Sequence, residues 1–73
     1  MKRIYIVCLN DEGPIKAFKT EEKAKNYLWG CYLDDYDEES LNKYSEQDAE
    51  TLRESNYIED YGYVVWVGVD FED

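Results

Sequence analysis

Apolar residues near the N-terminus follow a strand pattern. Residues 2–9 form a nearly continuous apolar run in which both alternating sets of side chains are apolar, so we expect a central strand buried on both faces. Gly13 and Pro14 are turn residues, and the short alternating segment 15–18 follows them. The pattern predicts a hairpin whose second strand is short and lies at a sheet edge.

A third strand is predicted at residues 62–70, where apolar residues alternate most clearly. One face of this strand would carry Tyr63, Val65, Val67, Val69 and Phe71. The other would carry Val64, Trp66 and Gly68, and we expect Trp66 to pack in the core or on the sheet. The aromatic and acidic segment 57–62 is interpreted as a loop before this strand.

The middle of the chain changes to a helical period. Thr20 is a suitable N-cap for a helix over residues 21–33, because Glu21 and Glu22 would follow it in the first turn. One apolar stripe of that helix would contain Ala24, Tyr27, Leu28 and Cys31, with Trp29 lying off the stripe.

A second helical segment is predicted near residues 38–56, with a thin apolar stripe formed by Leu41, Tyr44, Asp48 or Ala49, and Leu52. Ser45 resembles a second cap, so we expect one broken helix or two short ones. The predicted outer face of the segment consists of Glu38, Glu39, Glu46, Asp48, Glu50 and Glu54. The acidic residues 34–39 would form a solvated connection or the first turn of the following helix.

These elements predict one α+β domain over residues 1–73. A three-stranded, mainly antiparallel sheet would be covered on one face by the two helical segments. The sequence has no internal repeat and no linker long enough to separate a second domain.

Charge is distributed very unevenly along the chain. The formal net charge is -10, and residues 34–73 hold fourteen acidic and only two basic side chains. A nucleic-acid binder normally presents a basic face, so direct binding to nucleic acid is not expected. The asymmetry instead favours a basic protein partner.

Several classes of function are disfavoured by composition. The chain has no histidine, which excludes a histidine general base or metal ligand. There is no apolar run long enough to cross a membrane and no secretory signal pattern, so we expect a cytoplasmic protein. Cys8 and Cys31 are too far apart for a CxxC motif and are expected to be reduced. We therefore expect neither catalysis nor a bound cofactor.

A calcium loop is one candidate site, because Asp35, Asp37, Glu39 and Glu46 fall at positions 1, 3, 5 and 12 of an EF-hand pattern. Position 6 of that pattern requires glycine and holds Ser40, and position 9 holds Lys43. These two departures argue against a calcium site.

The stronger candidate is an acidic protein-binding surface. Tyrosines are interleaved with the carboxylates, and tyrosine supplies rigid contact area at many interfaces. The candidate partner-binding residues are Asp34, Asp35, Tyr36, Asp37, Glu38, Glu39, Tyr44, Glu46, Glu50 and Glu54. An acidic face that serves only solubility is the competing interpretation.

The chain resembles the small acidic proteins that bacteriophages encode to disable host enzymes. The resemblance lies in the short chain, the opening Met1-Lys-Arg-Ile-Tyr-Ile-Val, the helix start Thr20-Glu-Glu-Lys-Ala and the acidic, tyrosine-rich second half. It implies a non-catalytic cytoplasmic inhibitor or adaptor that engages a basic surface of a nucleic-acid-processing protein by imitating nucleic acid charge. The alternative is a regulatory module that self-associates, as a homodimer, through its sheet or an exposed Trp and Tyr patch.

Overall fold

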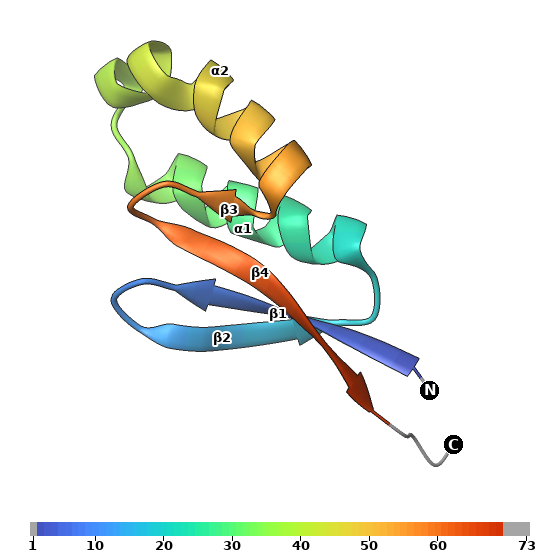
Figure 1. Ribbon diagram of the computed structural model, residues 1–73. Coiled ribbons are helices and arrows are strands. Elements are labelled where there is room, and N and C mark those ends of the chain that lie inside the picture. The colour runs from blue at the N-terminus through green and yellow to red at the C-terminus, as the bar shows by residue number, and fades with distance from the viewer. Residues whose placement is uncertain (1, 70–73) are drawn as a thin grey trace.

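The computed structural model describes residues 2–69, which form two helices and one four-stranded antiparallel sheet (Figure 1). The elements are β1 (Lys2–Leu9), β2 (Gly13–Phe18), α1 (Glu21–Asp35), α2 (Glu38–Ser55), β3 (Tyr57–Ile58) and β4 (Gly62–Val69). The strand order is β2-β1-β4-β3, which confirms the α+β class and the central place of β1. Residues 70 and 71, which the sequence pattern placed in or beside the last strand, lie outside the described residues.

Strand β2, the second strand of the hairpin, begins at Gly13 instead of the predicted residue 15. Gly13 has a φ of 78°, a left-handed conformation that glycine adopts without strain. The pairing contains a register shift between Val7 and Cys8, and β2 lies at the sheet edge as expected. The pairing of β1 with β4 continues without a shift from Lys2 opposite Val69 to Leu9 opposite Gly62.

The fourth strand, β3, corrects the prediction of a three-stranded sheet. Tyr57 pairs with Tyr63 and Ile58 pairs with Gly62, within a segment that we interpreted as a loop. Two residues are too few to show the alternation that identifies a strand in a sequence. Ile58 is only 1% exposed, so this short strand contributes directly to the core.

Helix α1 begins as predicted and ends two residues later, at Asp35. The Thr20 hydroxyl accepts a hydrogen bond from the backbone N–H of Lys23 at 3.3 Å. The buried residues of the helix are Ala24, Leu28 and Tyr32, which are spaced four apart. The predicted stripe is therefore wrong at its end, because Cys31 is only half-buried and Tyr32 is fully buried.

Helix α2 is continuous, so the prediction of a broken helix or two short ones is wrong. Asp37 supplies its N-cap, and Ser45 lies within the helix instead of starting a second one. Asn56 ends the helix in a left-handed conformation with a φ of 62°. Leu52 is the only buried residue of α2, so most of this helix surface faces solvent.

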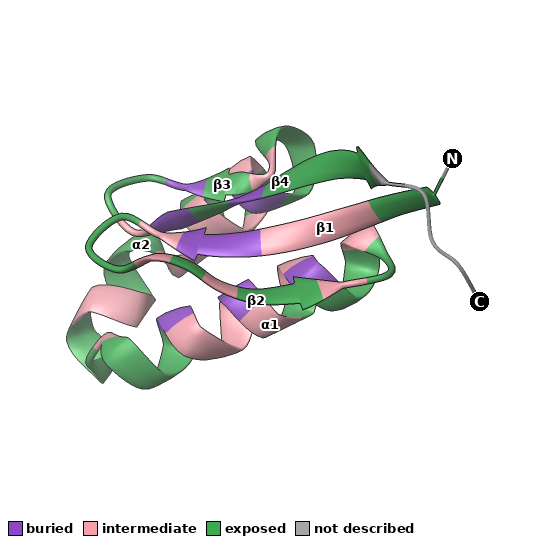
Figure 2. Cartoon of the chain, turned by 90° about the horizontal axis from the view of Figure 1, so that it is seen from below, coloured by how far each residue is buried: buried purple, intermediate pink, exposed green. Residues whose placement is uncertain are grey.

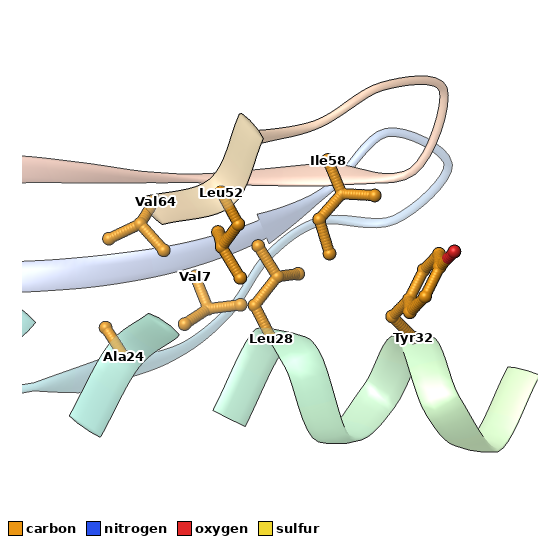
Figure 3. Close-up of a cluster of buried hydrophobic side chains, with 7 residues drawn as sticks. All are labelled: Val7, Ala24, Leu28, Tyr32, Leu52, Ile58 and Val64. Carbon is orange, nitrogen blue, oxygen red and sulfur yellow. The ribbon is translucent and has the colours of Figure 1, made fainter. Parts of the chain in front are cut away.

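The core lies between the sheet and the helices, as Figure 3 shows. Its buried cluster consists of Val7, Ala24, Leu28, Tyr32, Leu52, Ile58 and Val64. Trp66 does not belong to it, contrary to our prediction, because its side chain is 50% exposed. Its ring instead stacks with the guanidinium of Arg3, 4.2 Å from the ring centroid.

Both helices lie on the same side of the sheet, as predicted (Figure 1). Burial of β1 on the face without helices is only partial, because Cys8 is 4% exposed there but Ile4 and Ile6 are half-buried. Their cross-strand partners Val67 and Val65 are about 40% exposed, and Figure 2 shows much of β4 as exposed surface. An apolar sheet face is therefore open to solvent.

Candidate functional site

The junction between the two helices concentrates carboxylates. Asp34 and Asp35 occupy the last turn of α1, where the helix dipole disfavours negative charge, and that turn contains no basic residue. The Asp35 carboxylate accepts a hydrogen bond from the Tyr61 hydroxyl at 2.5 Å. This bond joins the end of α1 to the turn between β3 and β4.

Asp37 has a structural role that the sequence analysis did not assign to it. Its carboxylate accepts a hydrogen bond from the backbone N–H of Ser40 at 2.8 Å, which caps α2. The Ser40 backbone N–H and hydroxyl lower the pKa of Asp37 below its usual value. Glu38 and Glu39 follow in the first turn of α2, where the dipole favours them.

The outer face of α2 carries an acidic stripe, defined here as Glu46, Glu50 and Glu54. All three side chains are exposed, and their spacing of four residues places them along one side of the helix. Glu39 lies at the N-terminal end of the same side. Two exposed basic residues, Lys43 and Arg53, also lie on or beside this side of the helix.

Asp48 does not belong to the outer face, which corrects the sequence prediction. It is half-buried, and its Oδ2 accepts a hydrogen bond from the Tyr32 hydroxyl at 2.6 Å. Burial and this bond raise the pKa of Tyr32 far above its ordinary value. Figure 3 shows the Tyr32 hydroxyl at the edge of the core cluster, which allows it to meet a residue of α2.

Aromatic rings pack together behind the junction. Tyr32 stacks on Trp29 with ring centroids 4.8 Å apart, and it lies 4.5 Å from the ring of Tyr36. Tyr61 meets Tyr36 edge to face, with centroids 5.6 Å apart. Tyr36 is therefore held in place by its neighbours, whereas Tyr44 on α2 is 47% exposed.

A hollow of about 350 Å³ opens beside these rings. Its lining residues are Tyr36, Tyr44, Asp48, Glu59 and Asp60. They come from the end of α1, from two successive turns of α2 and from the turn between β3 and β4. We call this hollow the tyrosine–carboxylate cavity.

A smaller cavity of about 250 Å³ lies between the helices and differs in charge. Its lining includes Lys25, Trp29 and Arg53. The Lys25 ammonium is already engaged, because it donates to the backbone oxygen of Arg53 at 3.1 Å and pairs with Glu21 at 2.9 Å.

The acidic surface keeps its charge. Among residues 2–69, no carboxylate of the segment 34–54 forms an ion pair with a lysine or arginine. Lys16 instead lies over the rings of Phe18 and Tyr27, at 5.7 and 5.0 Å from their centroids. Basic residues from the first half of the chain therefore do not neutralise the candidate surface.

Other kinds of site find little support within the described residues. No group of three metal-ligating side chains could hold a metal ion in this part of the chain. The calcium pattern spans the end of α1 and nine residues of α2, so it does not form a binding loop. No helix in this range is long and apolar enough to cross a membrane.

The two free cysteines do not form an activated nucleophile. Cys8 is buried in β1, and Cys31 is half-buried on α1. Burial raises the pKa of the Cys31 thiol, so its reactive thiolate form is disfavoured at neutral pH.

The predicted site residues therefore fall into two groups. Asp34, Asp35, Tyr36, Asp37, Glu38, Glu39 and Tyr44 gather around the helix junction, whereas Glu46, Glu50 and Glu54 follow the outer side of α2. Sequence reasoning missed Glu59 and Asp60 as lining residues; it placed Asp48 both on the outer face, which is wrong, and as a possible member of the inward stripe, which agrees with its half-buried position. The position of Asp48 four residues before Leu52 could have indicated that it faces inward.

Comparison with known proteins gives no relative. No protein-family model, curated protein or solved structure matches the chain.

Proposed function

We propose that this protein is a non-catalytic, cytoplasmic inhibitor or adaptor that binds a basic surface of a nucleic-acid-processing protein. The observation that carries the proposal is the set of exposed carboxylates at the helix junction and along α2, which have no ion-pair partners among the described residues. Such a surface attracts a basic partner and speeds its association at low salt.

The placement of Asp34 supports a binding role over simple solubility, whereas Asp35 at the same helix end also accepts the hydrogen bond from Tyr61. Each carboxylate in the last turn of a helix opposes the helix dipole, at a cost of roughly 0.3–1 kcal/mol. A chain that required only solubility could carry these charges at helix N-termini, where they stabilise the fold. Departures from local preference of this kind concentrate at functional positions.

The charge density limits how closely the surface imitates DNA. Along the acidic stripe, one carboxylate follows every four residues, a rise of about 6 Å. One DNA strand carries a phosphate every 3.4 Å or so of axis. The stripe has about half that density, so the proposal relies on the stripe and the junction acting together.

The experiment is affinity capture from a bacterial lysate, followed by identification of the captured protein and by competition with duplex DNA. The test variant combines Glu46→Gln, Glu50→Gln and Glu54→Gln. The control variant combines Asp11→Asn, Glu12→Gln and Glu22→Gln, which changes the net charge equally at exposed positions in the first half of the chain.

We expect the protein to capture a nucleic-acid-binding protein that duplex DNA displaces. The test variant should retain this partner at least tenfold more weakly. The control variant should capture it normally. Equal capture by both variants, or a partner that DNA does not displace, would reject the proposed surface. Circular dichroism of each variant confirms that the fold is intact.

A second candidate function is self-association through the open sheet face. Tyr63, Val65 and Val67 are each about 40% exposed there, which favours contact with another surface. Sedimentation velocity at two concentrations tests it: a dimer that Val67→Lys dissociates supports this function, and a concentration-independent monomer excludes it.

A further inference from the structure

The tyrosine–carboxylate cavity combines two kinds of wall. Tyr36 and Tyr44 contribute aromatic rings, and Asp48, Glu59 and Asp60 contribute carboxylates. Its volume of about 350 Å³ lies at the lower end of the range for ligand pockets, so it suits one side chain or a small molecule.

Aromatic rings and carboxylates together select cations. The face of a tyrosine ring attracts a positive charge through its quadrupole, and a carboxylate pairs with the same charge directly. A guanidinium satisfies both requirements, because its plane stacks on a ring while its fork of N–H groups meets a carboxylate in a bidentate arrangement. An ammonium uses the same groups only as a point charge.

One ring of the cavity already attracts a cation within this chain. The Lys43 ammonium lies 5.2 Å from the centroid of the Tyr44 ring. Lys43 is not among the lining residues, and no ion pair joins Asp48, Glu59 or Asp60 to a lysine or arginine within residues 2–69. The carboxylates of the cavity therefore have no cationic partner among the described residues.

Two walls of the cavity are fixed before any ligand arrives. Tyr36 is packed against the rings of Tyr32 and Tyr61. Asp48 is oriented by the hydrogen bond from Tyr32, which occupies its Oδ2. A site with fixed walls loses less conformational entropy on binding.

We propose that the tyrosine–carboxylate cavity receives one arginine side chain of the basic partner, with its guanidinium between the tyrosine rings and paired with Glu59 or Asp60. This inference rests on the proposed function, which supplies the basic partner. It adds a specific anchor to a surface that otherwise attracts the partner only through general charge.

The test is a titration of the isotopically labelled protein with N-acetyl-arginine amide, followed by nuclear magnetic resonance. Signals of Tyr36, Tyr44, Glu59 and Asp60 should shift together and saturate in the millimolar range. The citrulline analogue, which has the same shape without the charge, should cause no saturable shift. The lysine analogue should bind at least threefold more weakly than the arginine analogue.

Variants locate the binding within the cavity. Glu59→Gln and Tyr44→Leu should each weaken binding of the arginine analogue at least threefold. Glu22→Gln makes the same charge change at an exposed position outside the cavity and outside the candidate surface, and it should leave binding unchanged. Lys43→Gln should strengthen binding, because it removes a cation that competes for the Tyr44 ring.

Two outcomes overturn the inference. One is the absence of saturable shifts, and the other is equal weakening by Glu22→Gln and Glu59→Gln, which would indicate general charge attraction. If either occurs while the capture experiment succeeds, the proposed function survives and only the anchor is lost. Specific arginine binding without any captured partner would instead reject the proposed function and leave a cation site.

Discussion

The hydrogen bond between Tyr32 and Asp48 provides the sharpest test of how α2 is attached to the fold. Leu52 is the only buried residue of this helix, and Leu41 is the other α2 residue that packs against the core cluster. The substitution Tyr32→Phe removes the hydroxyl and keeps the ring that packs against Trp29 and Tyr36. Any loss of stability then reports the hydrogen bond and not the core packing.

The magnitude follows from the geometry. The bond is short, at 2.6 Å, and its acceptor is a carboxylate. Hydrogen bonds to charged groups contribute roughly 1.5–3 kcal/mol. Asp48 is half-buried, so water can replace part of the lost partner, and we expect the lower end of this range. The free energy of unfolding should fall by about 1.5 kcal/mol.

Urea denaturation followed by circular dichroism measures this change. A small domain with a slope near 1 kcal/mol per molar urea should lose about 1.5 M from its midpoint. Tyr44→Phe is the matched control, because the Tyr44 hydroxyl forms no hydrogen bond within the described residues. A double-mutant cycle with Asp48→Asn should give a coupling energy of about 1 kcal/mol. The reasoning is refuted if Tyr32→Phe is as stable as Tyr44→Phe.

Three further predictions concern the core and the alkaline limit of stability. Leu52→Ala should lower the free energy of unfolding, measured in urea, by about 2–3 kcal/mol, because it leaves a cavity where the one buried side chain of α2 packs in the core. A loss below about 0.5 kcal/mol would contradict this role of Leu52. Gly62→Ala should destabilise by about 1–3 kcal/mol, since its new Cβ would lie 2.5 Å from a β1 carbonyl oxygen. In Gly30→Ala the new Cβ would meet no atom within 4 Å, so this substitution should stabilise the protein by roughly 0.5–1 kcal/mol. Equal changes in stability for Gly62→Ala and Gly30→Ala would contradict the close approach of β1 to Gly62. Burial and carboxylate partners raise the pKa values of Tyr32 and Tyr61, so the stability that they contribute below pH ~10 should be lost as the pH rises further. An ultraviolet titration should detect the ionisation of these two tyrosines last, and their ionisation together with the exposed tyrosines would contradict the raised pKa values.

The features that sequence predicted well are those fixed by local chemistry. Thr20 begins α1, and the long alternating run of β4 forms a strand, because each depends on neighbouring residues. The acidic residues of α2 are also exposed largely as expected, since the spacing of a helix determines its sides.

The features that were missed depend on contacts between distant residues. Strand β3 exists because Ile58 can pair with Gly62 and enter a core that α1 and α2 complete. The half-buried position of Asp48 depends on Tyr32, sixteen positions earlier. The two residues of β3 leave no periodic signal in their own segment, and the spacing of Asp48 before Leu52 indicates only which side of α2 it lies on, not its partner.

Trp66 illustrates the same limit for the core. A large aromatic residue between two valines is usually buried in a sheet. The helices do not extend far enough along β4 to cover it, so it stacks with Arg3 at 4.2 Å instead. How far a helix covers a strand is a property of the assembled layers and not of either segment.

Displacement of a labelled DNA duplex from the captured partner tests the central claim most directly. Fluorescence anisotropy should fall to that of free DNA as this protein is added, and the triple variant of Glu46, Glu50 and Glu54 should require at least tenfold more protein. Anisotropy that stays constant or rises would mean that the partner holds the DNA and this protein at the same time. The carboxylates of α2 would then not occupy the place of nucleic acid.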